Sequence, residues 1–452
     1  MRKDFYKQFF SIFIVLVLQN IVTLSVNLAD NMMLGGYSEM ALSGAAAVNQ
    51  VQFIYQQILM AVGDGMVIVG SQYWGRKQTK PMKKIAATAM RYGMVVCGFL
   101  FVLTGLVPGQ ILRIFTSDAA IIGEGTRYLR LIRYTYPFFA VTQVLLATMR
   151  SVEIVRIAFY LSIQSFFVNC GINYILIYGN FGAPEMGIAG AAIGTLTARI
   201  LECAEVLWYV FVKETRLRMK PGDYLHTDRE LSRDYRRIVT PLLIGQGSWG
   251  LNTAMQTVVL GHMTAAAIAA NSVAATLFLM VKSAAVGASS TASIVIGKAI
   301  GRGDLKRVQT DAVTMQKLFL TIGMISGALL FILRIPILNC YNLSDETRQM
   351  ANTFLIILSV VYIGMSYQMP VNSGIIRGGG SASFVVKMDM ISIWCIVIPL
   401  SFFMAFVVKA SPAVVVCCLN ADQIFKCVPA YIKVNHGNWI KKLTRDEHVR
   451  VE

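Results

Sequence analysis

The chain has 452 residues, of which 56% are hydrophobic and only 14% are charged. Because about a quarter of the residues of a soluble globular protein are charged, this composition excludes an ordinary soluble domain and predicts a polytopic protein of the lipid bilayer. The formal net charge of +17 could indicate a nucleic-acid partner, but the basic residues are spread over the connections between apolar runs, so no nucleic-acid partner is expected.

Twelve apolar runs follow one another along the chain, each of the roughly 20 residues that a membrane span needs. They cover residues 11–34, 44–71, 85–108, 127–149, 156–179, 187–212, 238–260, 265–297, 312–333, 350–374, 384–408 and 411–433. The sequence therefore predicts an all-α fold with twelve transmembrane helices.

The first run carries a stripe of polar residues. Asn20, Thr23, Asn27 and Asp30 follow at intervals of three or four residues, which places them on one face of a helix. A charged side chain at membrane depth costs about 2.5–3.5 kcal/mol to insert, and an acid there is functional by default. Asp30 is therefore a candidate functional residue, whereas the other members could instead hydrogen-bond a neighbouring helix.

Lysine and arginine residues alternate between the two ends of the predicted helices. They are absent from the turns at 35–43 and 180–186 but cluster at 76–84 and 213–237. Because cytoplasmic loops carry an excess of these residues, both termini are predicted to be cytoplasmic in a multi-pass protein of the plasma membrane. A few arginines on the outer side weaken this pattern without reversing it.

The two halves of the sequence repeat at an offset of 226 residues. LGGYSEMALSG (34–44) then aligns with LGHMTAAAIAA (260–270), and YWGRKQ (73–78) aligns with AIGRGD (299–304). Since six spans return the chain to the side on which it began, both copies insert in the same direction. We therefore expect two parallel six-helix repeats, a plan that is common among secondary transporters.

The repeat sets the predicted domain boundaries. Residues 1–212 form an N-lobe of helices 1–6, and residues 238–433 form a C-lobe of helices 7–12. The hydrophilic stretch 213–237 is predicted to be a cytoplasmic linker, and residues 434–452 a cytoplasmic tail.

Motifs for enzymatic or nucleotide-driven functions are missing from the sequence. It contains no GxxxxGK[ST], no HExxH and no GxSxG, and its eight cysteines lack metal-ligand spacing. We therefore expect neither an enzyme nor a bound cofactor.

Five segments are similar to one family of transporters. They are NLADNMMLGGYSEMALSGAAAVNQ (27–50), SQYWGRKQ (71–78), NCGINYILIYGNFGAPEMGIAGAAIGTLTAR (169–199), VIGKAIGRGD (295–304) and IIRGGGSASFVVKMDMISIWCIVIPLS (375–401). Together they resemble the multidrug and toxic compound extrusion transporters. The resemblance implies twelve helices in two lobes around a V-shaped cleft, and a monomer that exports cationic or amphipathic organic molecules in exchange for Na⁺ or H⁺.

The resemblance also implies an ion-coupling site in the N-lobe. Its residues would be Asp30 on the first helix, Asn169 and Asn173 on the fifth and Thr195 on the sixth. One carboxylate, two amide carbonyls and a hydroxyl supply oxygen ligands of the kind that hard cations prefer, so Na⁺ is a candidate ion besides H⁺. The alternative is that the two asparagines only tie helices together.

This chain departs from the family pattern at the acids. Family members often have an acid where this chain has Asn173, which leaves Asp30 as the only charge of the proposed site. Another branch uses acids on the seventh and tenth helices, but the matching positions here are near Gln246 and Ser366. The repeat equivalent of Asp30 is Gln256, so any coupling is expected to be asymmetric between the lobes.

A second set of polar residues is a candidate substrate cavity. It comprises Lys282, Gln56, Gln246, Asn252 and Gln256. A central ammonium such as that of Lys282 should face a cavity or an acid, although its long stem could instead reach an interface. On the sixth helix, Arg199, Glu202 and Glu205 are expected to pair along one face.

Two other functions stay open from the sequence. A flippase of lipid-linked saccharides shares this architecture and would need a more cationic central cavity. A receptor or scaffold that transports nothing would need no ion site, so its stability should not respond to Na⁺ or pH.

Overall fold

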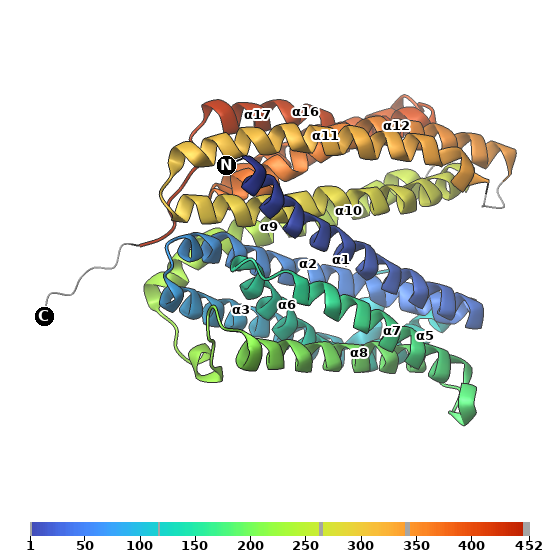
Figure 1. Cartoon of the computed structure of the whole chain (residues 1–452). Helices are drawn as coiled ribbons and strands as arrows, with labels where there is room; N and C mark the ends of the chain where they lie inside the picture. Colours follow the sequence, from blue (N-terminus) through green and yellow to red (C-terminus); the bar gives the residue numbers. More distant parts are fainter. Residues whose placement is uncertain (1, 116–117, 262–264, 340–343, 446–452) are drawn as a thin grey trace, which may run out of the picture. The chain divides into compact units, whose positions relative to one another are not determined.

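A computed structural model describes residues 2–115, 118–261, 265–339 and 344–445 of the chain, and the elements of these ranges are helices (Figure 1). The first half contains α1 (Arg2–Tyr37), α2 (Glu39–Gly75), α3 (Thr79–Leu106), α4 (Pro108–Leu112), α5 (Ala119–Ile132), α6 (Thr135–Ser151), α7 (Arg156–Tyr178), η1 (Asn180–Gly182), α8 (Ile188–Trp208), η2 (Tyr209–Lys213) and η3 (Pro221–Tyr224). The second half contains α9 (Arg229–Gly261), α10 (Ala265–Gly301), α11 (Leu305–Leu338), α12 (Asp345–Met369), η4 (Pro370–Ile376), α13 (Ala382–Ile391), η5 (Ser392–Val397), α14 (Ile398–Phe402), η6 (Phe403–Val407), α15 (Pro412–Leu419), α16 (Asp422–Phe425) and α17 (Cys427–His436).

Side chains that accept hydrogen bonds from the first turn mark several helix starts. The Asp118 carboxylate accepts from the backbone of α5, Asp228 from α9, and Asp304 from α11. Ser344 does the same for α12 through its hydroxyl. Each cap satisfies backbone N–H groups that the helix itself leaves without partners, which is why these residues fix where the helices begin.

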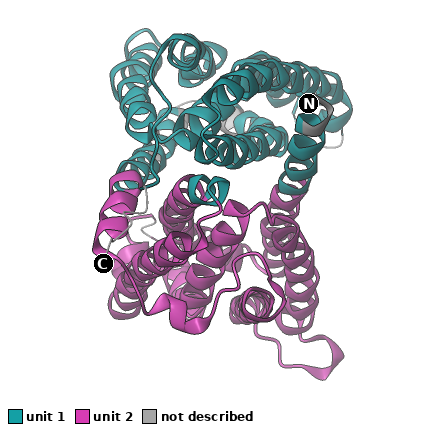
Figure 2. Cartoon of the chain, turned by 60° about the vertical axis from the view of Figure 1, so that its left-hand side comes forward, with its two compact units in different colours: residues 1–17, 71–76, 240–452 teal, residues 18–70, 77–239 magenta. Residues whose placement is uncertain are grey.

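The described chain forms two compact units, which do not follow a single cut in the sequence (Figure 2). Unit 1 contains residues 1–17, 71–76 and 240–452, and unit 2 contains residues 18–70 and 77–239. Both α1 and α2 therefore contribute one segment to each unit. Most of the predicted N-lobe lies in unit 2, and most of the predicted C-lobe lies in unit 1.

Helices cover each of the twelve predicted spans, within the described residues. Within the described ranges, nine helical segments are long and apolar enough to cross a membrane. The three other predicted spans are helical but are not plain apolar runs. Residues 127–149 are divided between α5 and α6 at a turn. Charged residues such as Arg199 lie within α8, and polar residues such as Gln246 interrupt α9.

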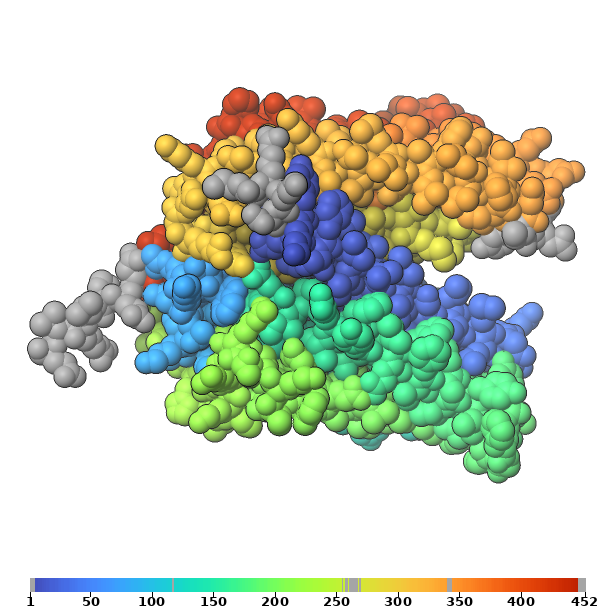
Figure 3. Space-filling view, viewed as in Figure 1, coloured from blue at the N-terminus to red at the C-terminus, as the bar shows by residue number. Residues whose placement is uncertain are grey.

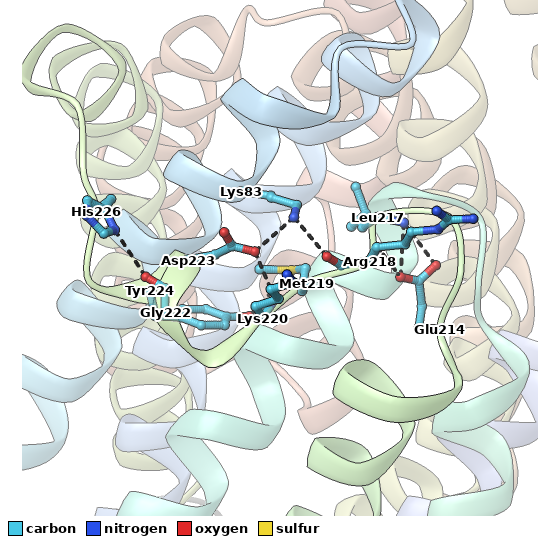
Figure 4. Close-up of polar contacts among 10 residues, drawn as sticks. All are labelled: Lys83, Glu214, Leu217, Arg218, Met219, Lys220, Gly222, Asp223, Tyr224 and His226. Carbon is cyan, nitrogen blue, oxygen red and sulfur yellow. Dashed lines mark hydrogen bonds and ion pairs between the residues drawn. The ribbon is translucent and has the colours of Figure 1, made fainter.

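The predicted linker is part of unit 2, where an ion pair and hydrogen bonds hold it. The Lys83 ammonium lies 2.8 Å from Asp223 Oδ2 and donates at 2.8 Å to the Arg218 carbonyl (Figure 4). Glu214 accepts the backbone N–H of Arg218 at 3.0 Å, and Asp223 accepts that of Lys220 at 2.8 Å. Burial raises the pKa of Asp223, but the Lys83 ammonium and the Lys220 N–H outweigh burial and leave the pKa below its ordinary value.

The segment after α17 is packed on unit 1. Within this segment Trp439 is buried. The side chain of Gln72, near the end of α2, forms hydrogen bonds with the backbone of the segment at two positions. Gln72 Nε2 donates to the Lys441 carbonyl at 3.1 Å, and its Oε1 accepts the Leu443 N–H at 2.8 Å. Residues 434–445 of the predicted tail are thus held by hydrogen bonds, while 446–452 lie outside the described residues.

Small residues bring α7 and α8 close together in unit 2. The two helices lie side by side in the space-filling view (Figure 3) and make extensive contact. A Cβ atom at Gly190 would lie 2.6 Å from the Leu176 carbonyl oxygen, and one at Gly194 would overlap the side chain of Asn173. Glycines four residues apart allow helix backbones to approach in this way in membranes. This approach positions the polar residues of α7 against α8.

Candidate functional site

Four polar residues of unit 2 form one hydrogen-bonded chain that links three helices. Asn173 Nδ2 on α7 donates to Asp30 Oδ1 on α1 at 2.6 Å and also to Asn169 Oδ1 at 3.2 Å. Asn169 Nδ2 in turn donates to Thr195 Oγ1 on α8 at 3.2 Å. The structure thus brings together all four residues that the family resemblance implied as a set.

Helix geometry explains why these side chains meet. Asn169 and Asn173 are four residues apart, which places both on one face of α7. They are 1% and 0% exposed, so their amides must find partners within the protein. Gly194 clears the space on α8 that Asn173 occupies, and Thr195 follows directly in the sequence.

The oxygen atom of the Asn173 amide differs from the other amide atoms of this hydrogen-bonded chain because it has no hydrogen-bond partner among the described residues. Asn173 Oδ1 is buried and accepts no hydrogen bond from the described residues. A buried polar atom without a partner costs about 1–3 kcal/mol, so natural structures retain one where a ligand, water or ion completes it. The Asp30 carboxylate accepts a hydrogen bond from the nitrogen of the same amide, and the oxygen that is left without a partner is suited to a cation or a proton donor.

A metal site rich in acids is not available here. Within the described ranges no group of three or more His, Cys, Asp and Glu residues could hold a metal ion. A cation at this position would therefore depend on Asp30 for charge and on amide and hydroxyl oxygens for its other ligands, a set that suits Na⁺ better than a transition metal.

The four-residue chain borders a cavity within unit 2. Asp30 and Thr195 line it together with polar and aromatic residues of α1, α2, α5, α6 and α8, among them Asn27, Gln52, Gln56, Tyr55, Phe139 and Arg199. The cavity therefore combines an acid, a base, amides and aromatic rings. Such a mixture is typical of a site for organic molecules.

The sequence analysis missed Arg199 as a cavity residue. It predicted correctly that Arg199 pairs with Glu202, and the Nη1 to Oε2 distance is 2.7 Å. Glu205 instead bonds Gln164 of α7. That the guanidinium also borders the cavity depends on the packing of α8 against α6, which the spacing of charges along α8 does not reveal.

The polar stripe of the first helix divides in two. Asn27 and Asp30 line the cavity, as predicted for a functional face. Thr23 bonds its own helix, donating its hydroxyl to the Gln19 carbonyl at 3.0 Å, and Asn20 is partly buried. The stripe therefore contributes its C-terminal half, Asn27 and Asp30, to the site.

The predicted substrate-cavity residues fall in both units. Gln56 lines the cavity of unit 2, whereas Gln246, Asn252 and Gln256 lie on α9 and Lys282 on α10, in unit 1. The Lys282 ammonium is 5.1 Å from the centre of the Trp249 ring. Asn252 Oδ1 is buried and accepts no hydrogen bond from the described residues.

Unit 1 contains a buried ionic cluster that the sequence analysis did not anticipate. Lys426 Nζ lies 2.9 Å from Asp389 Oδ1 and 2.8 Å from Asp422 Oδ2, and Arg377 is 3.7 Å from Asp389 Oδ2. Two cations thus balance two carboxylates, which is how charges are retained in a protein interior.

Ser366 stands near the position at which another branch of the family has an acid. Its hydroxyl donates a hydrogen bond to the Phe319 carbonyl at 3.1 Å.

The MatE family model matches residues 16–175 and 242–403. The two matched segments begin 226 residues apart, at the offset of the internal repeat. Together they cover well over half of the chain, so the family resemblance of the five sequence segments is confirmed.

Relatives of similar length carry transporter names. A probable multidrug resistance protein NorM of Thermotoga maritima is 23% identical over 95% of this chain and 92% of its own length. The uncharacterized transporter YisQ of Bacillus subtilis is 20% identical over 92% of this chain and 90% of its own length.

Solved structures confirm the predicted fold. A MATE transporter of Vibrio cholerae, VcmN in the bent form, has a TM-score of 0.85 at 15% identity over 96% of both chains. A MATE protein in the straight conformation has a TM-score of 0.86 at 15% identity over 95% of both chains. The all-α membrane fold expected from the twelve apolar runs is therefore correct.

Proposed function

Because the chain belongs to the MatE family, we propose that it is a secondary antiporter that exports cationic or amphipathic organic molecules in exchange for Na⁺ or H⁺. The names of its relatives as multidrug resistance proteins support the export of varied organic compounds. The observation that carries the proposal is an intramembrane acid, Asp30, that lines a cavity and accepts a hydrogen bond from Asn173 Nδ2, while the oxygen of the same amide accepts none from the described residues.

Asp30 would act as the switch between the two bound species. A carboxylate that borders a cavity with aromatic walls attracts an organic cation, and the same carboxylate loses that attraction once Na⁺ or H⁺ neutralises it. The hydrogen-bonded chain to Thr195 connects this change of charge on α1 to the packing of α7 and α8. Exchange of the two ligands is therefore a consequence of their competition for one charge.

The membrane potential drives this exchange where the exported molecule carries no net charge, whereas the exchange of one monovalent cation for another moves no net charge and relies on the concentration gradient of the ion. One positive charge that moves inward across 100 mV releases about 2.3 kcal/mol, and a concentration gradient of the ion adds to this. In transporters built from repeats, alternating access comes from movement of one repeat against the other. We propose the same movement here, with ion binding at Asp30 as its trigger.

Transport of a fluorescent organic cation from proteoliposomes, with Na⁺ and pH gradients imposed separately, tests the proposal. We expect one of the two gradients to accelerate export and Asp30→Asn to abolish that acceleration. Asp345→Asn, which removes an exposed carboxylate at the start of α12, is the matched control and should transport normally. Ion-dependent export that persists in Asp30→Asn would exclude this role of Asp30.

A further inference from the structure

We propose that the linker docks onto the anionic headgroups of phospholipids in the cytoplasmic leaflet through a strip of exposed cations. This docking strip consists of Lys213, Arg216, Arg218 and Lys220, all in unit 2. The inference goes beyond the proposed function and does not depend on it. It follows from the exposure of the cations, from the internal bonds of the nearby acids and from the apolar side chains beside the strip.

Burial alternates along the segment that carries most of the docking strip. Leu217 and Met219 are 3% and 2% exposed, whereas Arg216, Arg218 and Lys220 are exposed. The two apolar side chains therefore fix the segment in unit 2, while the cations next to them lie at the surface. Three positive charges thus stand within five consecutive residues of one short exposed segment.

The two acids of this part of the linker bond other groups (Figure 4). Glu214 is 6% exposed, and its carboxylate accepts the backbone N–H groups of residues 216–218. Asp223 Oδ2 lies 2.8 Å from the Lys83 ammonium and accepts the Lys220 N–H at 2.8 Å. Both carboxylates are therefore held by the backbone or by a lysine outside the docking strip. The charged ends of the strip are left for an anion that the chain does not supply.

Two arginines of the docking strip are held in place by the protein. Arg218 has a φ of 49°, in the left-handed region, which residues with a Cβ rarely adopt. Glu214 accepts its N–H at 3.0 Å and the Lys83 ammonium donates to its carbonyl at 2.8 Å, which together hold this conformation. Residues in such conformations gather at ligand-binding sites. Arg216 Nη1 donates to the Val152 carbonyl at 2.6 Å, which uses one of five guanidinium donors.

Apolar side chains beside the docking strip favour a phospholipid over a soluble anion. Trp208 and Val212, at the end of the sixth predicted span, are 56% and 69% exposed, and the Lys213 ammonium lies 5.8 Å from the centre of the Trp208 ring. Tryptophan is enriched where a span meets the headgroups, and groups of lysines and arginines directly after a span bind anionic lipids. A soluble phosphate would need only the cations, whereas a phospholipid also covers the apolar side chains.

A fluorescent probe within the docking strip tests the inference. Thr215 is exposed, so Thr215→Cys in a cysteine-free background of the full chain accepts an environment-sensitive dye. The purified protein in uncharged detergent is titrated with phosphatidylglycerol or with phosphatidylcholine of the same acyl chains. We expect phosphatidylglycerol to associate at least tenfold more tightly. Equal association of the two lipids would overturn the proposal. An equal response to inorganic phosphate would also overturn it, because a free anion would then suffice.

The triple variant Arg216→Gln/Arg218→Gln/Lys220→Gln removes most of the charge of the docking strip. Each cation near a membrane surface contributes about fivefold to the binding of anionic lipid, so the preference for phosphatidylglycerol should fall at least tenfold. The matched control, Arg302→Gln/Lys306→Gln/Lys387→Gln, removes three exposed cations of unit 1 and should keep the wild-type preference. An undiminished preference in the linker variant would overturn the assignment of the strip.

Two further variants separate the charge of the docking strip from the fold of the linker. Arg216→Lys/Arg218→Lys retains both charges and should keep the wild-type preference, because attraction to a charged surface does not require the guanidinium fork. Lys213→Gln/Lys220→Gln leaves the buried side chains and the bonds of Arg218 unchanged, and its preference should fall at least fivefold. An unchanged preference in this double variant would contradict the proposal even if the triple variant failed to fold. The assay involves no transport, so its result is independent of the proposed antiport.

Discussion

Asn173 shows how much one uncharged residue contributes to the candidate site. Its amide nitrogen joins Asp30 to Asn169, and its oxygen accepts no bond from the described residues. An acid at this position would add a second negative charge beside Asp30. With an amide, the site holds a single charge, so it should bind a monovalent ion instead of a divalent one.

Gly194→Ala is expected to disable the site without removing any polar group. The added Cβ would overlap Asn173 Oδ1, so Asn173 must rotate away from Asp30. We expect ion-driven export to fall at least tenfold and stability to fall by about 1–3 kcal/mol, the usual cost of overpacking. The measurements are proteoliposome transport and unfolding in mixed micelles.

Gly171→Ala is the matched control for this substitution. Gly171 lies on α7, two residues from Asn173, and a Cβ there would meet no atom within 4 Å. Normal transport in both variants would show that the position of Asn173 is not critical.

At the scale of elements, the predicted linker (213–237) has a defined structure although it lies outside the membrane-spanning runs. The predicted linker is held to the start of α3 by Lys83 and to its own backbone by Glu214 and Asp223 (Figure 4). Ionic contacts thus hold a segment that also buries the side chains of Leu217 and Met219. Such a segment should respond to pH, since its order depends on carboxylates.

Asp223→Asn is expected to loosen the linker in a pH-dependent way. The pKa of Asp223 is lowered in the folded protein, so its contribution is present above the unfolded value of about 3.9 and is lost as pH falls through the folded value. Between pH 5 and 8 we expect about tenfold less hydrogen-exchange protection of residues 214–224 in the variant. The difference should shrink as the pH falls below about 3.9.

Asp304→Asn is the control for the hydrogen-exchange experiment, because it removes one negative charge at a site outside the linker. Asp304 caps α11, far along the chain from the linker, and asparagine caps helices as well as aspartate does. Its linker protection should equal that of the wild type. Equal protection in Asp223→Asn at pH 7 would show that the contact with Lys83 does not order the linker.

At the scale of the whole molecule, apolar side chains cover the outward surface of the helices. Val95, Phe99 and Leu106 on α3 and Ile325 and Ile332 on α11 are all more than half exposed. Side chains of this kind are stable against lipid and not against water. The charge distribution along the connections then sets which ends of the helices face the cytoplasm.

The predicted orientation can be measured with single cysteines in a cysteine-free background. Phe181→Cys in the loop after α7 should react with an impermeant maleimide added to intact cells. Leu225→Cys in the linker should react only after permeabilisation. Phe181 and Leu225 are 88% and 75% exposed, so access to the thiol itself is comparable. The opposite labelling pattern would place both termini outside.

The resemblance to one family supplied the four members of the candidate ion site. The sequence by itself predicted the membrane class, the twelve helices and the repeat. These features depend on local rules: apolar run length sets the spans, and a spacing of four residues places Asn169 and Asn173 on one face of a helix. Asp30 stood out for the same reason, because a charge within an apolar run is visible without any tertiary contact.

Only the tertiary structure decided that Asn173 bonds Asp30, that Arg199 faces the same cavity, and that Lys426 joins two acids of unit 1. The bond between Asn173 and Asp30 spans 143 positions of the chain and that between Lys426 and Asp389 spans 37. Such contacts depend on how helices pack and rotate against one another, and hydropathy and periodicity describe one helix at a time.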